Sequence, residues 1–197
     1  KNMQIKGRLN AQGTSGNKIT FTSNVSSPFA GDWGSIQFLE ESTDASFSGS
    51  TYTSGSIMKY CIVEYGTELY IYNSSPFVQY SEFRYNSSNG IRVSGTGTYL
   101  WVNNCDIHHN SRGVNVYASQ SSALFSYNTI RDNAPEGGGF AGSSTFSYNT
   151  IKNNAVTNNS CNDCGGGIKI DNTDFDHNLI SGNSNSISDD ASGLYIY

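Results

Sequence analysis

The sequence predicts an all-β solenoid without substantial helix, in which short strands stack coil upon coil around a thin core. Segments of similar sequence recur at an interval of one coil, which is typical of solenoids and propellers. Within each copy, apolar residues alternate over only a few positions, as they do in a half-buried strand. Hydrophobic residues make up 36% of the chain, which is low for a globular domain and suits a thin core repeated many times.

Charge and composition exclude several classes of partner. Charged residues are only 14% of the chain and the net charge is −5, so no basic field attracts nucleic acid phosphates. No apolar run approaches the roughly 20 residues that span a bilayer. Abundant Tyr, Ser and Asn with few Lys favour an extracellular or cell-surface protein over a cytosolic enzyme.

Each copy of the repeat contains one apolar anchor. Segments such as 80–83 (Tyr-Ser-Glu-Phe) and 127–130 (Tyr-Asn-Thr-Ile) align in a single register. The anchors are Val63, Phe83, Ile107, Ile130, Ile151 and Ile180. Five positions before them stand the apolar residues Met58, Val78, Val102, Phe125, Phe146 and Phe175. Three positions after them stand Gly66, Asn86, Asn110, Asn133, Asn154 and Asn183. This last position suits a turn that needs either positive φ or a side chain that caps backbone groups.

The position two before each anchor forms a further column, which holds Cys61, Ser81, Cys105, Asn128, Asn149 and Asn178. Because equivalent residues of stacked coils lie ~4.8 Å apart, the Asn amides are expected to satisfy one another along the axis. Cys61 and Cys105 are separated by Ser81, hence by two coil rises, which exceeds the ~7 Å limit for a disulfide. Both are expected to be buried free thiols.

A third strand of the form Gly-apolar-x-apolar completes each coil. Copies begin at Gly90, Gly113, Gly167 and Gly193, and Leu69-Tyr70-Ile71 and Gly139-Phe140 are degenerate versions. Together with the pattern Phe-x-x-Asn-x-Ile-x-x-Asn, this repeat resembles the right-handed parallel β-helix family, the pectate-lyase-like superfold, over nearly the whole chain. The resemblance implies roughly seven coils and three short parallel sheets. It implies little about activity, because such folds carry unrelated functions.

One β-helix domain is expected over residues 1–197, with irregular N-terminal coils at 1–56 and regular coils at 57–197. Insertions interrupt the coils at 39–56, 155–166 and 184–192, and such insertions often gather on a binding face. Solenoids normally need a polar cap over each end, so the abrupt ends are expected to mark a piece of a longer protein. End-to-end stacking of neighbouring molecules is the alternative.

Cys161 and Cys164 lie in the second of these insertions. No second Cys pair or nearby His pair accompanies them, so the spacing does not favour zinc. A disulfide between them is expected, which suits an oxidising compartment. A redox-active pair is the alternative reading.

Enzymes of the family place their binding groove on the third strand, whose outward column here reads Gln37, Tyr70, Arg92, Asn115, Gly139, Lys169 and Tyr195. Such a column suits a sugar-binding floor. Aromatic faces pack against pyranose rings, while Asn, Arg and Lys supply hydrogen bonds or pair with uronate carboxylates. The candidate carbohydrate-binding residues are therefore Tyr70, Arg92, Asn115, Lys169 and Tyr195. A solvated sheet face of the same composition is the alternative.

The family also contains lyases with an Arg or Lys base, often beside calcium held by carboxylates. Arg92 and Lys169 have this chemistry, but three coils separate them and no carboxylate shares their column, so a calcium-assisted site is not supported. Family hydrolases carry Asn-Thr-Asp and Asp-Asp motifs that protonate the leaving oxygen and activate water. Asp189 and Asp190 precede a third strand as in that family, whereas the Asn-Thr-Asp at 172–174 follows one.

A second outward surface follows the anchors and includes Glu64, Arg84, His108, Arg131 and Lys152. Alternating charges on successive coils are expected to stabilise the stack only modestly, by ~0–1 kcal/mol per exposed pair. The adjacent His108 and His109 could in principle bind a metal ion or act in acid–base catalysis. Consecutive strand residues point to opposite sides, so a solvated pair is expected instead.

These features predict an extracellular or cell-surface β-solenoid module with a carbohydrate-binding or structural role, a polysaccharide or cell-surface glycan as its partner, and no cofactor. One alternative is a polysaccharide lyase or glycoside hydrolase acting on an acidic polysaccharide. Its catalytic candidates are Arg92, Lys169, Asp189 and Asp190. Another is a structural fibre that assembles end to end.

Overall fold

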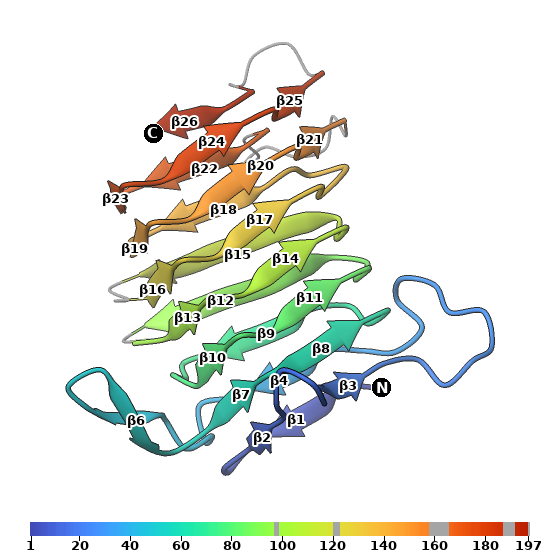
Figure 1. Cartoon of the computed structure of the whole chain (residues 1–197), viewed down its shortest axis with the longest axis vertical. Coiled ribbons are helices and arrows are strands. Elements are labelled where there is room, and N and C mark those ends of the chain that lie inside the picture. Colours follow the sequence, from blue (N-terminus) through green and yellow to red (C-terminus); the bar gives the residue numbers. More distant parts are fainter. Residues whose placement is uncertain (97–98, 120–122, 158–165, 187–191, 197) are drawn as a thin grey trace.

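The computed structural model describes residues 1–96, 99–119, 123–157, 166–186 and 192–196. Within them, short strands stack into three long parallel sheets around one elongated core (Figure 1). Sheet A contains β1 (Met3–Ile5), β4 (Ile36–Phe38), β9 (Leu69–Tyr72), β12 (Asn89–Thr96), β15 (Arg112–Ser119), β18 (Gly139–Gly142), β22 (Ile168–Asp171) and β26 (Leu194–Ile196). Sheet B contains β2 (Asn10–Gln12), β7 (Ile57–Lys59), β10 (Phe77–Gln79), β13 (Trp101–Asn103), β16 (Ala123–Ser126), β19 (Ser144–Ser147) and β23 (Asp174–Asp176). Sheet C contains β3 (Ile19–Phe21), β8 (Cys61–Glu64), β11 (Glu82–Arg84), β14 (Asp106–His108), β17 (Thr129–Arg131), β20 (Thr150–Lys152) and β24 (Leu179–Ser181).

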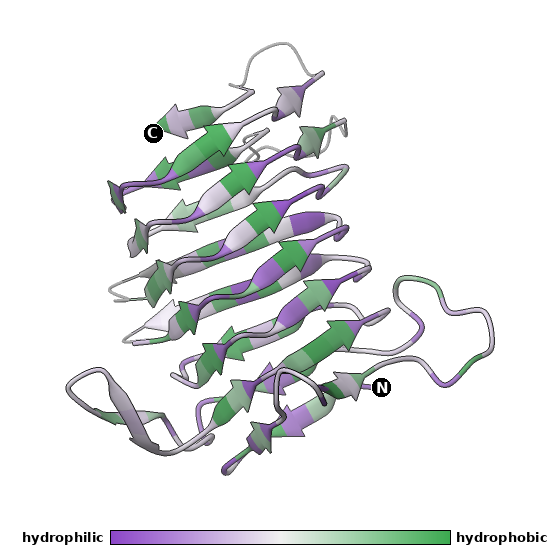
Figure 2. Ribbon diagram, in the orientation of Figure 1, coloured by the Kyte–Doolittle hydropathy of each residue, from purple (hydrophilic) through white to green (hydrophobic). Residues whose placement is uncertain are grey.

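The strand register confirms the predicted column of anchors and the apolar column that precedes it. Pairing in sheet C joins all the anchors from Val63 to Ile180. Pairing in sheet B joins the apolar residues from Met58 to Phe175. All are fully buried except Ile180 and Phe175 of the last coil, which are partly exposed. Figure 2 shows the resulting hydrophobic positions recurring from strand to strand up the stack.

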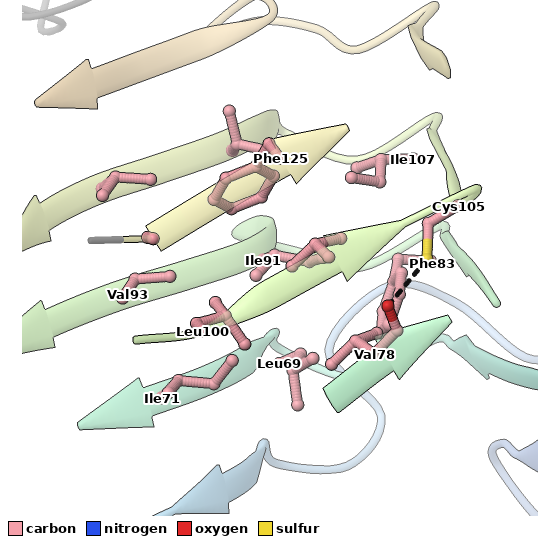
Figure 3. Close-up of a cluster of buried hydrophobic side chains, with 14 of the residues drawn as sticks. Leu69, Ile71, Val78, Phe83, Ile91, Val93, Leu100, Cys105, Ile107 and Phe125 are labelled. Atoms are coloured by element: carbon pink, nitrogen blue, oxygen red, sulfur yellow. Dashed lines mark hydrogen bonds between the residues drawn. The ribbon is translucent and has the colours of Figure 1, made fainter. Parts of the chain in front are cut away.

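Side chains from all three sheets meet in this core, as Ile91, Phe125 and Ile107 show in Figure 3. The rings of Phe125 and Phe146 stack on consecutive coils, with centroids 4.6 Å apart and planes 14° apart. The fold class is thus an all-β parallel solenoid, as predicted. Within the described ranges, no segment forms a helix that is long and apolar enough to cross a membrane.

Cys61 and Cys105 are buried free cysteines, as predicted. The Sγ of Cys105 faces the Val78 carbonyl in the core (Figure 3). Burial raises the pKa of the Cys61 thiol to about 11 and that of Cys105 to about 12. Both residues therefore act as small apolar fillers rather than as nucleophiles.

Two ladders of asparagine side chains run along the corners. One, between sheets B and C, contains Asn128, Asn149 and Asn178. The other, after sheet C, contains Asn86, Asn110, Asn133, Asn154 and Asn183. In a typical link, Oδ1 of Asn133 accepts from the backbone N–H and Nδ2 of Asn110, while its Nδ2 donates to the Ile107 carbonyl and to Oδ1 of Asn154. These residues therefore cap backbone groups. The left-handed backbone lies one position earlier, as at Asp132 (φ 54°).

The glycine that opens the third strand is required by close packing. A Cβ at Gly90 would lie 2.4 Å from the Cγ2 of Ile107 and 2.8 Å from the Gly113 carbonyl oxygen. Both distances are too short for a side chain. Only glycine lets this corner approach the neighbouring coil, which explains the recurrent Gly-apolar-x-apolar pattern.

The first insertion folds into an antiparallel hairpin of β5 (Ser46–Ser48) and β6 (Thr51–Ser54), which extends from the first coils in Figure 1. Phe47 of this hairpin packs on the rings of Phe77 and Trp101, 5.2 and 5.5 Å away. The hairpin therefore covers part of the outer face of sheet B. The other two insertions begin with β21 (Ala155–Val156) and β25 (Ser184–Asn185), which pair in parallel.

Candidate functional site

The predicted carbohydrate-binding column lies on the outer face of sheet A. Parallel pairing aligns Gln37, Tyr70, Arg92, Asn115, Phe140, Lys169 and Tyr195 on successive coils. Gly139 does not belong to this column, contrary to the sequence-based register, because it pairs with the inward Val114. Three consecutive glycines, 137–139, left the register open, and Gly138 is the one that matches Gly113. An aromatic side chain, Phe140, therefore takes the place predicted for Gly139.

Tyr70 and Arg92 form the lower, accessible part of the column. The guanidinium carbon of Arg92 lies 5.0 Å from the centroid of the Tyr70 ring, within range of a cation–π contact. The hydroxyls of Tyr70 and Ser94 are 2.8 Å apart and hydrogen-bonded. Arg92 also lies 3.7 Å from the Glu68 carboxylate, yet 43% of its side chain is exposed. Its charge is therefore only partly compensated within the chain.

The upper part of the column is more deeply buried. Asn115, Phe140 and Lys169 are each less than 10% exposed. The ring of Tyr117 packs 4.9 Å from that of Phe140, and Nζ of Lys169 lies 5.4 Å from the centroid of the Tyr195 ring. Neighbouring aromatic side chains thus cover much of the surface that the sequence suggested would be open.

Two buried polar atoms in the column have no hydrogen-bond partner within the described part of the chain: Nε of Arg92 and Oδ1 of Asn115. Arg92 and Asn115 pair directly in the register of β12 and β15. Buried polar groups without a partner are uncommon and call for an explanation such as a bound molecule or water. The two atoms mark the part of sheet A that is best suited to a polar ligand.

Sequence reasoning missed a parallel outward column that flanks the first one. It contains Tyr72, Ser94 and Tyr117, aligned by the pairing of β9, β12 and β15. Tyr72 is 39% and Tyr117 is 46% exposed. The signal for them was available, because period-2 alternation continues two residues beyond Tyr70 and Asn115. The strands β12 and β15 follow it for eight residues each.

The outer face of sheet C carries a network of ion pairs. Arg84 binds Glu64 at 2.7 Å and Glu82 at 2.6 Å. Arg131 binds both carboxylate oxygens of Asp106, at 3.1 and 2.8 Å. Because the members of each pair lie on adjacent coils or on the same strand, they satisfy one another within the sheet. The described ion pairs on this face therefore join neighbouring coils, and the charges in them are already paired within the sheet.

His108 and His109 do not point to opposite sides, so that expectation is wrong. Their Nδ1 atoms lie 2.7 Å apart. His109 lies at a corner with a left-handed backbone (φ 54°), where the alternation of a strand does not apply. Nε2 of His108 lies 3.1 Å from the Glu82 carboxylate, to which it donates, so the neutral His108 accepts a hydrogen bond at Nδ1 from His109.

Residues 38–197 match the family described as right handed beta helix region. The chain belongs to this right-handed β-helix family. The comparisons with curated proteins and with solved structures found no match. Each regular coil of the β-helix contributes one strand to each of sheets A, B and C. The family defines a fold, so any activity has to be argued from side chains.

The β-helix does not bring together Arg92 and Lys169, the two catalytic candidates within the described residues. Arg92 and Lys169 share a column but are three coil steps apart, which is ~14 Å, too far to act on one proton. Asp189 and Asp190 lie outside the described residues, as do Cys161 and Cys164, so the predictions made for them stand as predictions. Among the described residues, no three His, Cys, Asp or Glu side chains are grouped so as to hold a metal ion.

The stability of this β-helix should depend on the protonation of His108. Burial lowers the pKa of His108, although Glu82 and Asp106 favour its protonated form. The unfolded chain, with a His pKa of about 6.5, therefore takes up a proton before the folded chain does, and the contribution of neutral His108 is lost as the pH falls below that value. We expect the free energy of unfolding in urea to decrease between about pH 7.5 and pH 5.5, and the decrease to be smaller in His108→Gln.

The matched control is His177→Gln, since 63% of the His177 side chain is exposed. Its free energy of unfolding should decrease over this pH range as much as that of wild type. An equal decrease in wild type and His108→Gln would contradict this assignment.

Proposed function

We propose that this β-helix is an extracellular or cell-surface module that binds a polysaccharide along the outer face of sheet A. The observation that supports it most is the adjacent pair of buried polar atoms, Nε of Arg92 and Oδ1 of Asn115, that lack a partner within the described residues. One is a donor and the other an acceptor. Sugar hydroxyls both donate and accept, so a glycan that displaces the side chains covering these two residues would satisfy both atoms.

The aromatic side chains of the face suit the same ligand. Tyr72 and Tyr117 flank the column and are exposed. Aromatic rings bury a large apolar area while keeping a polar hydroxyl, which matches the apolar and polar faces of a sugar ring. From Tyr70 to Tyr195 the column extends over five coil steps, or ~24 Å, which is long enough for an extended oligosaccharide.

The charge of the face favours an acidic polysaccharide. The exposed guanidinium of Arg92 is only loosely paired with Glu68 and can form a bidentate contact with a uronate carboxylate. The net charge of −5 opposes binding of any polyanion at long range. The interaction should therefore depend on this local cation, and binding should weaken with added salt.

A glycan-binding panel tests the proposal. The purified chain is titrated with neutral and uronate-containing polysaccharides, and the dissociation constant is measured by calorimetry for wild type, Arg92→Ala and Tyr117→Ala. We expect a uronate polysaccharide to bind, and Arg92→Ala to weaken that binding at least about tenfold. Lys152→Ala, which removes a cation from β20 of sheet C, is the matched control and should bind as wild type does.

Two results would contradict the proposal. The first is equal affinity of wild type and Arg92→Ala, or no binding to any glycan. The second is release of unsaturated or reducing sugar ends that is abolished in Arg92→Ala, because it would make this face an active site rather than a binding surface.

A further inference from the structure

A column of residues that are aromatic in all but one coil follows the corner between sheets B and C, one residue in each coil. Every member has a left-handed backbone, with φ between 50° and 57°. We call it the corner ladder, and it consists of Tyr60, Tyr80, Asn104, Tyr127, Tyr148 and His177. It precedes the strands of sheet C and therefore lies on a different part of the surface from the outer face of sheet A.

The rings of this ladder stack directly on one another. Tyr60 and Tyr80 have centroids 5.0 Å apart and planes 13° apart. Tyr127 and Tyr148 are 5.1 Å and 7° apart, and Tyr148 and His177 are 4.8 Å and 18° apart. These distances are close to the rise of ~4.8 Å per coil, so the ring planes lie across the solenoid axis. Each ring therefore turns its two faces to the coils before and after it.

The stack is interrupted once, at Asn104. Tyr80 and Tyr127 are paired with rings on one side only and lie two coil rises, about 10 Å, apart. Tyr127 is 57% exposed, compared with 47% for Tyr148, which has a ring on both sides. Tyr80 is 38% exposed, and Nζ of Lys59 lies 5.9 Å from the centroid of its ring. One face of the Tyr80 ring and one face of the Tyr127 ring are therefore directed toward each other across the coil that contains Asn104.

The Asn104 side chain does not close this interval. It is short, and its Nδ2 donates sideways to Oδ1 of Asn103, which is itself held by Nε2 of Gln79 and by Ser126. In the described part of the chain, Oδ1 of Asn104 makes no hydrogen bond, and the residue is exposed. The interval therefore has two aromatic walls and an amide acceptor at its base.

We propose that this interval between Tyr80 and Tyr127 is a binding slot for a single pyranose ring. A flat ring in contact with both walls needs about 7–8 Å, since carbon atoms approach to 3.5–4.0 Å. The interval of about 10 Å leaves room for a thicker, puckered chair whose C–H faces contact both tyrosines. Oδ1 of Asn104 accepts a hydrogen bond from a sugar hydroxyl, and this polar contact fixes the orientation of the ring.

This slot is independent of the polysaccharide site proposed for sheet A. It holds one sugar unit, whereas sheet A offers an elongated surface, and the two share no residue. A small methyl glycoside therefore probes the slot, and a polysaccharide probes sheet A. Either proposal can fail while the other holds.

Asn104→Tyr is the decisive variant. It places a ring in the slot at a position where four neighbouring coils already carry tyrosine with the same backbone. The variant is expected to fold with a melting temperature within a few degrees of wild type, because stacking in the completed ladder offsets the loss of an Asn from a left-handed position. Binding of neutral and uronate methyl pyranosides, measured by saturation-transfer NMR and titration, should be saturable in wild type and at least tenfold weaker in Asn104→Tyr.

Asn153→Tyr is the matched control, because it adds the same ring at another left-handed corner (φ 55°) outside the slot. It should bind the methyl pyranoside as wild type does, while Tyr127→Ala should bind it at least tenfold more weakly. Three results would overturn the proposal: no saturable binding of any methyl pyranoside to wild type, equal affinity of wild type and Asn104→Tyr, or binding of indole but of no pyranoside.

Discussion

Asn133→Ala is expected to lower the free energy of unfolding by about 3–4 kcal/mol, because it interrupts the asparagine ladder after sheet C at a fully buried position. The substitution removes four side-chain hydrogen bonds of 2.9–3.1 Å. It leaves the backbone N–H of Asn110 and the carbonyl of Ile107 buried without these partners, and each such group costs about 1–3 kcal/mol. Urea denaturation followed by far-UV circular dichroism measures the change.

Asn10→Ala provides the comparison, since Asn10 is exposed on the first strand of sheet B and should change stability by less than about 0.5 kcal/mol. Equal changes in the free energy of unfolding for Asn133→Ala and Asn10→Ala would contradict this prediction. They would mean that the hydrogen bonds of the asparagine ladder contribute no net stability.

Phe125→Ala is expected to destabilise the chain by about 3–5 kcal/mol through the cavity it leaves in the core. Phe125 is fully buried, and its ring stacks on that of Phe146. The coils above and below fix the strand positions through backbone hydrogen bonds, so the surrounding residues can close only part of the space. Thermal and urea unfolding of the variant and wild type give the difference.

The same two coils offer a matched surface substitution. Tyr148 stacks on Tyr127 in the same manner, but it is 47% exposed. Tyr148→Ala should therefore cost less than Phe125→Ala, because about half of the Tyr148 side chain is already in water. Equal losses for Phe125→Ala and Tyr148→Ala would mean that ring stacking, rather than burial, dominates both sites.

The columns of the fold could be predicted from sequence because a solenoid repeats its environment at every coil. Ile107 and Ile130 occupy the same position in successive copies, so aligning the copies also aligned residues that pair in space. The buried thiols of Cys61 and Cys105 followed from the same alignment, since two coil rises separate them.

The corners were predicted less well, because side-chain direction there depends on φ rather than on alternation. Strand alternation predicts opposite directions for His108 and His109, but the left-handed backbone of His109 turns its ring toward His108. The register at Gly139 was ambiguous for a related reason, since three successive glycines present no side chain to mark which one faces the neighbouring coil.

The candidate site on sheet A was likewise predicted in part. Its residue types and its column on sheet A followed from the pattern around Tyr70 and Arg92. The burial of Asn115 beneath its neighbours, and the contact of Arg92 with Glu68, depend on how side chains from different coils pack together. No spacing rule within a single copy contains that information.

The amide ladders also have a direction. In every link, Nδ2 of the residue in one coil donates to Oδ1 of the residue in the next coil toward the C-terminus, from Asn86 to Asn183 and from Asn128 to Asn178. The amide oxygens of both ladders therefore face the N-terminal coils, and the axial components of their dipoles add rather than cancel. Such aligned hydrogen bonds polarise one another. The solenoid thus has an electrical polarity along its axis, negative toward the first coils, which its nearly balanced sheet dipoles would not provide.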